Sequence, residues 1–340
     1  MAANEVPARM PVLVTGGAGY IGSHAVLALC DAGWPVVVLD NLVTGFRWAI
    51  DPRATFVEGD VGDAALVART LSGFGIGAIL HFAGSVVVPE SVVDPLKYYG
   101  NNTANSRTLL AAAVAGGVRH FIFSSTAATY GVPPESPVRE TMPTVPINPY
   151  GMSKLMTEIM LRDTAAAHPI NYCVLRYFNV AGADPEGRSG QATQGATHLI
   201  KVAGEAVTGK RSHVSVFGTD YDTPDGTGVR DYIHVSDLAA AHLLALEALI
   251  AEPVRSHTLN CGYGRGFSVL EVLDAVEAAS GVAIERRMEP RRAGDPDELV
   301  AANEAIVATF GWRPRHDDLR TIVEHALAWE RGLEARRAAG

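Results

Sequence analysis

Short apolar segments alternate with segments of helical spacing through the first half of the chain. The apolar segments are rich in β-branched residues and predict strands at 11–15, 35–40, 55–60, 78–84, 119–125 and 172–178. Apolar residues three and four positions apart predict helices at 20–32, 63–72, 95–115 and 150–168. Strands that are apolar on both faces are typical of a parallel sheet covered by helices on both sides. The pattern therefore predicts an α/β fold with a doubly wound parallel sheet.

The pattern loosens after residue 180. Gly-rich loops at 181–195 and 218–231 precede a helix near 197–209 and a strand and helix within 232–249. The rest predicts a small α/β unit with a strand near 257–260, a helix at 268–279, a basic turn at 290–295 and a closing helix at 317–336. We expect a dinucleotide-binding domain over 1–180 and a smaller C-terminal α/β substrate domain over 181–340. A segment near 232–260 can return to the first domain.

The composition is that of a soluble globular protein, with 48% hydrophobic and 19% charged residues among 340. The 37 acidic residues outnumber the 28 basic ones, which gives a formal net charge of −9. Nucleic acids and anionic membranes are recognised by basic surfaces, so neither is expected as a partner. A small anionic ligand is compatible with this charge, because a few well-placed cations are enough to bind it.

Cysteine content and the N-terminal segment bear on the compartment. Cys30, Cys173 and Cys261 are odd in number and far apart, which argues against a disulfide framework or a cysteine zinc site. The N-terminal residues lack the apolar run of a signal peptide, and no apolar run is long enough to span a membrane. We expect a cytoplasmic protein without a metal site.

Three glycines, each three residues apart, lie where the first predicted strand passes into the first predicted helix. They are Gly16, Gly19 and Gly22, in the sequence TGGAGYIG at 15–22. This spacing permits a tight turn, close approach of the backbone to a pyrophosphate and close packing of the helix on the strand. The motif indicates a Rossmann dinucleotide site.

Two aspartates sharpen the prediction of the cofactor. Asp40 ends the second predicted strand, eighteen residues after Gly22, where a carboxylate can bind the adenosine ribose hydroxyls. Asp60 ends the third predicted strand, near the expected adenine edge. A 2′-phosphate beside Asp40 would be repelled, so we expect NAD rather than NADP. The alternative interpretation of Asp40 is a solvated turn aspartate.

A tyrosine and a lysine lie four residues apart at the start of the helix at 150–168. Tyr150 and Lys154 in YGMSK therefore share one helical face. Free tyrosine has a pKa of about 10, and a neighbouring ammonium favours its phenolate form. We expect Tyr150 to act as a base that Lys154 assists. The alternative for Lys154 is an exposed helix lysine.

The predicted strand at 119–125 runs into three hydroxyl residues at the carboxyl edge of the sheet, where ligands of such folds bind. Thr126 is the best placed of these to contact a substrate hydroxyl. Its alternative role is local capping, which threonine performs at many turns. The ordered set of Thr126, Tyr150 and Lys154 is more specific than any one member.

These motifs resemble those of the UDP-glucose 4-epimerases, a group of extended short-chain dehydrogenases/reductases, across nearly the whole chain. The further matching segments are LDN (39–41), FVEGD (56–60), HFAG (81–84), FSST (123–126), LRYFN (175–179), DGTGVRDYIHV (225–235) and PRRAGD (290–295). DGTGVRDYIHV discriminates best, because most other extended members share only the earlier motifs.

The resemblance implies a redox cycle that leaves NAD unchanged. Tyr150 would remove the proton of the sugar 4-hydroxyl while C4 passes a hydride to NAD. The 4-keto sugar would then rotate about its bond to the diphosphate and take the hydride back on its opposite face. Lys154 would lower the pKa of Tyr150 and hold the nicotinamide ribose, and Thr126 would bridge to the 4-hydroxyl. UDP-glucose and UDP-galactose are the implied substrates, and a homodimer through the helices at 95–115 and 150–168 is the implied assembly.

The resemblance also assigns the two binding sites. The implied NAD site comprises Gly16, Gly19, Tyr20, Ile21, Gly22, Asp40, Asn41, Asp60, Val61, Phe82, Ala83, Gly84, Asn101, Ser124, Tyr150, Lys154 and Phe178. The implied UDP-sugar site comprises Thr126, Tyr150, Asn179, His198, Leu199, Arg230, Arg292, Asp295 and Leu299, together with a strand of Ser215, Val216 and Phe217 that would take the uracil edge. Guanidinium groups suit a diphosphate, although solvated charge is the alternative for Arg292.

The chain departs from the family pattern at three positions. Val86 stands where many relatives have a lysine near the cofactor, and His198 stands where an asparagine commonly contacts the nucleotide. Leu299 stands at the gate position, which is often tyrosine or cysteine. Leucine at the gate predicts preference for UDP-glucose over N-acetylated UDP-sugars.

Three other functions use the same scaffold. Nucleotide-sugar 4,6-dehydratases place Asp-Glu after the threonine, where this chain has Ala127 and Ala128, which cannot transfer protons. A non-catalytic NAD-binding regulator would not need Thr126, Tyr150 and Lys154 together. Epimerisation of UDP-xylose and UDP-arabinose uses the same residues, so the sequence does not separate it from the hexose reaction.

Overall fold

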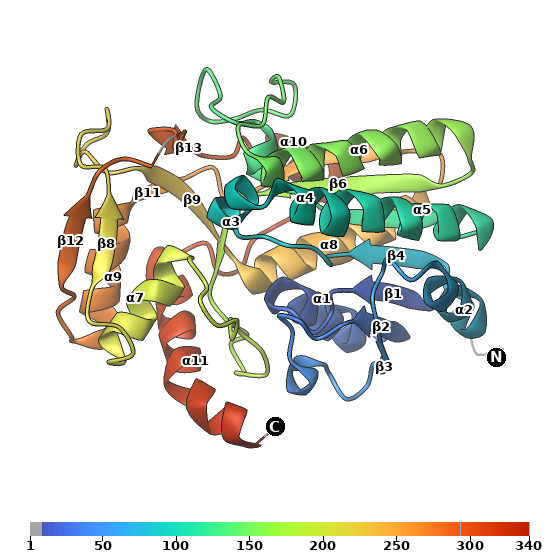
Figure 1. Ribbon diagram of the computed structural model, residues 1–340, viewed down its shortest axis with the longest axis horizontal. Helices are drawn as coiled ribbons and strands as arrows, with labels where there is room; N and C mark the ends of the chain where they lie inside the picture. Colours follow the sequence, from blue (N-terminus) through green and yellow to red (C-terminus); the bar gives the residue numbers. More distant parts are fainter. Residues whose placement is uncertain (1–8, 293, 340) are drawn as a thin grey trace, which may run out of the picture.

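The computed structural model describes residues 9–292 and 294–339 (Figure 1). Its largest element is a parallel sheet of seven strands in the order β10-β6-β5-β4-β1-β2-β3. The strands are β1 (Val12–Thr15), β2 (Val36–Asp40), β3 (Thr55–Glu58), β4 (Ala78–His81), β5 (His120–Ser124), β6 (Asn171–Tyr177) and β10 (His257–Cys261). The order reverses between β1 and β4, which is the point where ligands bind in open α/β sheets.

Helices cover both faces of this sheet, as Figure 1 shows. One face packs on α1 (Tyr20–Asp31) and α8 (Val235–Ala251), and the other on α2 (Ala64–Phe74), α5 (Asn105–Ala115) and α6 (Pro149–Ala167). Inward residues such as Val14 and Val38 are fully buried on the first face, and Leu13 and Phe121 on the second. The predicted doubly wound α/β fold is therefore confirmed.

The rest of the chain forms a smaller α/β unit, drawn at the left of Figure 1. Two short sheets build it, one pairing β8 (Val214–Phe217) with β12 (Arg286–Glu289) and one joining β11 (Gly266–Ser268), β9 (Val229–His234), β13 (Glu298–Leu299) and β7 (Asn179–Ala181). Three helices enclose its own apolar core, namely α7 (Leu199–Val207), α9 (Val269–Ser280) and α11 (Leu319–Ala339).

The chain crosses between the two units more than once. Beyond residue 180, α8 packs on α1, and β10 adds the last strand to the large sheet by pairing with β6. Both elements lie within or beside the segment 232–260 that the sequence allows to return. The division of the chain at residue 180 stays a prediction.

Several short elements are absent from the sequence prediction. They are α3 (Val88–Val93), α10 (Glu304–Phe310), the 3₁₀ turns η1 (Arg47–Ala49) and η3 (Ala127–Thr129), and the small strands β7, β11, β12 and β13. By contrast, α4 (Pro95–Tyr98) lies within the helix predicted at 95–115, and β8 contains the strand expected at 215–217. The helix predicted at 95–115 is also interrupted by a π-helical stretch, η2 (Tyr99–Ala104). Elements this short carry too few apolar residues to show a period, so tertiary contacts decide them.

The length and apolar character of the helices bear on whether the chain crosses a membrane. Within residues 9–292 and 294–339, no helix has the length and apolar character needed to cross a bilayer.

Candidate active site

The passage from β1 into α1 is so tight that only glycine fits at two positions, one in the loop and one in the first turn of α1. Gly16 has φ +71°, and a Cβ atom there would lie 2.6 Å from the backbone nitrogen of Ala83. A Cβ atom on Gly22 would overlap the carbonyl oxygen of Gly16. Gly19 begins α1 without a side-chain cap, so the first N–H groups of the helix keep their capacity for a ligand. This cradle fits the pyrophosphate of NAD.

Asp40 ends β2 and is buried rather than solvated, with 8% of its surface exposed. Its Oδ2 accepts a hydrogen bond from the backbone nitrogen of Ala18 at 2.9 Å, and Oδ1 accepts one from that of Leu42 at 2.8 Å. Burial raises the pKa of this carboxyl, and the two hydrogen bonds oppose that rise. Because each carboxylate oxygen can accept two hydrogen bonds, Asp40 fixes the glycine loop and retains acceptor capacity for ribose hydroxyls.

Asp60 lies just beyond β3 and joins two neighbouring asparagines. Asn41 donates to its Oδ2 at 2.8 Å, and Asn105 donates to its Oδ1 at 3.0 Å. The backbone nitrogen of Gly62 also donates to Oδ1, at 2.7 Å. The adjacent Val61 is buried. The carboxyl ends of β2 and β3 are therefore held together where the adenine edge is predicted.

The HFAG segment leaves β4 and passes beneath the π-helical stretch η2. Asn102 accepts from the backbone nitrogen of Ser85 at 2.7 Å, and Asn101 donates to the Ser85 hydroxyl at 2.9 Å. A Cβ atom on Gly84 would lie 2.9 Å from Asn102 Oδ1 and 3.8 Å from Lys154 Nζ. The missing side chain of Gly84 thus brings this segment close to the lysine. π-Helical turns are frequent at functional sites.

Tyr150, Thr126 and Lys154 come together where β5 and α6 meet the carboxyl edge of the sheet. All three are buried, with exposed fractions of 7%, 8% and 3%. Tyr150 and Lys154 lie one turn apart on α6, as the sequence predicts. Thr126 lies close enough to the Tyr150 phenol to lower its pKa, and its Oγ1 accepts from the backbone nitrogen of Ala128 at 3.1 Å. Thr126 therefore caps the turn that follows it and also lies beside Tyr150, so the two interpretations do not exclude each other.

The surroundings of Lys154 and Tyr150 set the pKa values of both side chains. Its Nζ donates to the carbonyl oxygen of Ser124 at 3.1 Å and lies 5.0 Å from the centroid of the Phe123 ring. Burial lowers the pKa of Lys154 to about 8, while the charge of Glu158 opposes this. Burial raises the pKa of Tyr150, and the hydrogen bond with Thr126 offsets only part of the rise. Desolvation is therefore the main influence on the Tyr150 pKa, and its lowering by Lys154 stays a prediction.

The predicted gate residue borders the catalytic group. Leu299 lies on β13, beside Arg230 of β9, and packs on a buried cluster that includes Phe178, Ala127 and Tyr130. Ala127 directly follows Thr126, so the cluster on which Leu299 packs adjoins the threonine. Its side chain is only partly buried.

The three predicted cationic and acidic substrate residues differ in their contacts. Arg230 donates to its neighbouring carbonyl, that of Val229, at 2.8 Å, and its Nη2 lies 3.9 Å from Asp295 Oδ1. Arg292 stacks on Phe217, with its guanidinium carbon 3.8 Å from the ring centroid. The predicted strand that contains Ser215, Val216 and Phe217 is thus joined to the basic turn.

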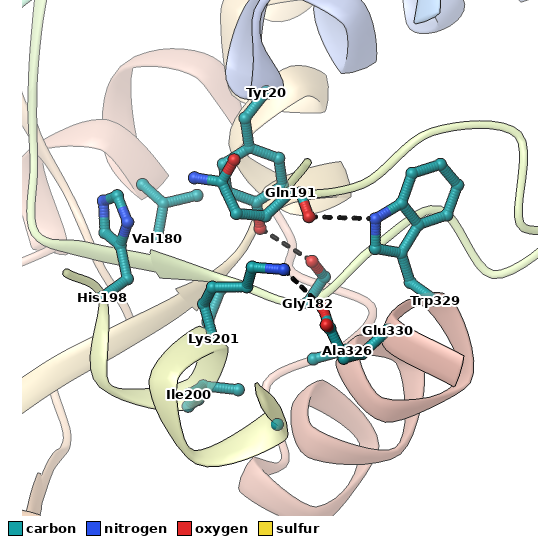
Figure 2. Close-up of a pocket in the computed structure, with 12 residues that line it drawn as sticks. Tyr20, Val180, Gly182, Gln191, His198, Ile200, Lys201, Ala326, Trp329 and Glu330 are labelled. Atoms are coloured by element: carbon teal, nitrogen blue, oxygen red, sulfur yellow. Dashed lines mark hydrogen bonds and ion pairs between the residues drawn. The ribbon is translucent and has the colours of Figure 1, made fainter. Parts of the chain in front are cut away.

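A small, partly open pocket lies between α1, β7 and the loop after it, α7 and α11 (Figure 2). Tyr20 donates to the carbonyl oxygen of Gly182 at 2.7 Å, and Lys201 pairs with Glu330 at 2.5 Å. His198 lines this cavity, but Tyr150, Thr126 and Lys154 do not. Tyr20 therefore turns its side chain toward the smaller unit, whereas the backbone of its loop belongs to the nucleotide cradle.

Sequence reasoning missed the polar network beneath α6. Glu158 forms a two-pronged pair with Arg176, and its Oε1 also accepts from the Ser125 hydroxyl at 2.5 Å. Arg176 donates to the Tyr130 hydroxyl at 3.0 Å, which in turn donates to Asn260 Oδ1 at 2.7 Å. One signal was available, since Glu158 lies two turns after Tyr150 on the face that carries Lys154.

The comparisons with known proteins agree with this geometry. Residues 12–262 match the model of the NAD dependent epimerase/dehydratase family. The chain is 58% identical to a UDP-glucose 4-epimerase of Azospirillum brasilense, over 97% of this chain and 95% of that protein.

Solved structures give the same result. UDP-glucose 4-epimerase from Brucella ovis in complex with NAD has a TM-score of 0.91 and 44% identity, covering 94% of this chain and 98% of that one. The Bifidobacterium longum enzyme in complex with NAD⁺ and UDP has a TM-score of 0.89 and 38% identity, covering 95% and 98%. With its glycine cradle, its buried Asp40 and its Tyr150–Lys154 pair, this chain belongs to the NAD dependent epimerase/dehydratase family.

Proposed function

We propose that this chain interconverts UDP-glucose and UDP-galactose by transient oxidation at sugar C4, with NAD retained throughout. The observation that carries the proposal is the meeting of Tyr150, Thr126 and Lys154 at the carboxyl edge of the sheet, beside the glycine cradle. The names of the relatives at up to 58% identity support the same reaction. Ala127 and Ala128, in place of an acid and a base, argue against dehydration.

The proposed mechanism assigns the proton to Tyr150. Its phenolate takes the proton of the sugar 4-hydroxyl and later returns it, while Thr126 orients that hydroxyl. NAD, when bound, supplies the ring that accepts and returns the hydride at C4. Because burial raises the pKa of Tyr150, the phenolate needs nearby positive charge, which the Lys154 ammonium provides.

The proposed substrate contacts lie on the smaller unit. Arg230 and Arg292 bind the diphosphate, because guanidinium groups form charge-assisted hydrogen bonds with phosphate oxygens. The β8 residues Ser215, Val216 and Phe217 receive the uracil edge, and Leu299 limits the space around the sugar. Residues 1–180 hold NAD in this proposal, and residues 181–340 mainly hold the UDP-sugar.

The proposal includes a cytoplasmic homodimer. Exposed apolar side chains on α3, α4 and α6 support a second copy as the partner, since a contiguous apolar face favours association. They include Val93 at 86% exposed, Leu96 at 79% and Ile159 at 39%.

Sugar analysis after incubation tests the reaction. Purified protein is given UDP-glucose, UDP-galactose, UDP-xylose or UDP-arabinose without added NAD, and the products are separated by chromatography. We expect UDP-glucose and UDP-galactose to interconvert, and we expect denatured protein to release about one NAD per chain. Conversion of only the pentoses would reassign the substrate. Loss of water from the sugar, or release of only NADP, would overturn the proposal.

A further inference from the structure

The loop that follows β2 forms one wall of the glycine cradle. Phe46 donates from its backbone nitrogen to the carbonyl oxygen of Ala18 at 3.0 Å, and a Cβ atom on Gly45 would lie 2.8 Å from the Ala18 Cβ atom. Ala18 also donates from its backbone nitrogen to Asp40 Oδ2 at 2.9 Å. Because the loop begins at Asp40 and returns to Ala18, it bounds the side of the cradle where the adenosine ribose is predicted to bind.

Aromatic rings join this loop to the last helix of the chain. The Phe46 ring stacks on Trp48 of η1, with centroids 5.2 Å apart and ring planes at 29°. Trp48 also contacts Trp329 of α11, with centroids 6.1 Å apart. Both separations lie in the range of favourable aromatic pairs. We call the rings of Phe46, Trp48 and Trp329 the aromatic clasp. It packs on a small buried cluster of Ala183, Ala192 and Leu333.

Trp329 is the fixed end of the aromatic clasp. It is 4% exposed, and its Nε1 donates to the carbonyl oxygen of Gln191 at 3.1 Å (Figure 2). A Cβ atom on Gly190 would overlap its ring, so the ring packs directly on the backbone of the loop after β7. The same loop reaches α1, since the hydroxyls of Ser189 and Ser23 are hydrogen-bonded at 2.6 Å. The clasp therefore leads from one wall of the cradle to a part of the smaller unit that is itself anchored on α1.

The polar contacts of the loop do not reach the smaller unit. Leu42 donates from its backbone nitrogen to Asp40 Oδ1, and Val43 donates from its own to Asn41 Oδ1 at 3.2 Å. The ion pair of Arg47 with Glu58 spans 3.7 Å and is exposed on both sides, so it is expected to contribute little. In the part of the chain that the structure describes, the aromatic clasp is thus what ties this loop to α11.

We propose that Trp48 and Trp329 are positioning residues for the cofactor, which hold the loop at 41–46 against the cradle and so slow the release of NAD. This inference rests on the proposed function, in which NAD stays bound through turnover. For NAD to leave on this side, the loop has to move away from Ala18, and that movement separates the rings of the aromatic clasp. Loss of the clasp should therefore shorten the residence of NAD.

Exchange of the bound cofactor measures this residence without turnover. Purified protein with its bound NAD is mixed with an excess of isotopically labelled NAD, and protein samples freed of unbound dinucleotide are denatured at intervals. Mass spectrometry of the released dinucleotide then gives the rate of replacement. We expect Trp48→Ala to exchange NAD about three- to tenfold faster than the wild type, because it removes the central ring of the aromatic clasp. Trp48→Phe keeps a ring there and should restore most of the slow exchange.

Phe310→Ala is the matched control for the loss of a half-buried aromatic ring. Phe310 lies on α10 and packs edge-on against His257 of β10, with centroids 5.6 Å apart. In the large sheet, β6, β5 and β4 separate β10 from β1, so this ring is remote from the cradle. Phe310→Ala should lower thermal stability and leave the exchange rate of NAD unchanged at temperatures well below unfolding.

The possible outcomes separate this inference from the proposed function. An unchanged exchange rate in Trp48→Ala, or an equal acceleration in Phe310→Ala, overturns the role of the aromatic clasp. If Trp48→Ala does not fold, Trp48→Leu takes its place, because it keeps apolar bulk without an aromatic pair. Slow exchange in a wild type that does not interconvert UDP-glucose and UDP-galactose would overturn the proposed function, while faster exchange in Trp48→Ala would still support the clasp. A wild type that carries no dinucleotide would overturn both.

Discussion

The proposed catalytic edge of the large sheet and the proposed substrate side of the smaller unit differ in how deeply their charged groups are buried. Lys154, Glu158 and Arg176 are at most 7% exposed and are held by hydrogen bonds to fixed partners. On the smaller unit, Arg292 is exposed, and the side chain of Asp295 is 41% exposed, although its partner Arg230 is only 15% exposed. The first region is organised before any ligand arrives, and the second keeps its charges accessible to water.

The difference reflects what each region has to do. A base and its cationic neighbour need a fixed geometry and low dielectric, which burial provides at the cost of desolvation. A diphosphate brings its own charge and is bound by cations that can still move. Changes at the buried edge should therefore be large and affect rate or stability, whereas changes at the open side should be smaller and affect binding.

The largest expected effect is on rate at the buried edge. Tyr150→Phe removes the proposed base and keeps the ring, so turnover should fall by about 10²–10⁴-fold. UDP affinity, measured by calorimetry, should stay close to that of the wild type, because the variant leaves the diphosphate residues intact. A near-wild-type rate would remove Tyr150 from the mechanism.

The buried ion pair should dominate stability. Arg176→Met leaves the Glu158 carboxylate without its partner, and breaking such a pair costs about 3–5 kcal/mol. Chemical denaturation measures this loss. Arg162→Met is the control, because the pair of Arg162 with Asp163 is 65% exposed on both sides and is expected to matter little.

The double variant sharpens this prediction. Combining Glu158→Gln with Arg176→Met removes both charges, and it should recover part of the stability that Arg176→Met loses. If the double variant is no more stable than Arg176→Met, shape rather than charge determines the role of this pair.

On the open side, the expected effect is on substrate binding. Arg292 stacks on Phe217 and forms no ion pair with another described residue, so its guanidinium is available to a diphosphate. Arg292→Ala should raise the Michaelis constant more than it lowers turnover, because the substrate loses about 1.5–3 kcal/mol of binding free energy. Arg291→Ala is the matched control, since Arg291 already pairs with Asp220 at 2.7 Å. Equal changes of the Michaelis constant in the two variants would show that Arg292 is a solvated surface charge and does not bind the diphosphate.

The smallest effect should be on the preference between UDP-sugars of different size. Leu299 packs on the cluster around Phe178 and Ala127, and overfilling a packed wall costs about 1–3 kcal/mol. Wild-type protein should therefore prefer UDP-glucose to UDP-N-acetylglucosamine, and Leu299→Ser should narrow the gap. The ratio of kcat/KM for the two sugars measures it. Equal kcat/KM values for the two UDP-sugars in the wild type would show that Leu299 does not limit the size of the sugar.

The sequence by itself determined the sheet and the local chemistry. Apolar strands, glycine spacing and the i, i+4 pair Tyr150–Lys154 each depend on residues close together in the chain, so their periodicity is visible without coordinates. Gly16 and Gly22 are confirmed as positions where a side chain does not fit. NAD as the cofactor follows from the family to which the chain belongs.

Only the tertiary structure decided the pairings across long stretches of chain. Arg176 and Glu158 come from different elements, and Tyr130 meets Asn260 across 130 residues. The π-helical stretch that carries Asn101 and Asn102, and the short strands β12 and β13, have no period of their own. The raised pKa of Tyr150 also depends on burial, which sums contributions from the whole fold. Local spacing identifies which residues can react, but desolvation and distant partners set their charge.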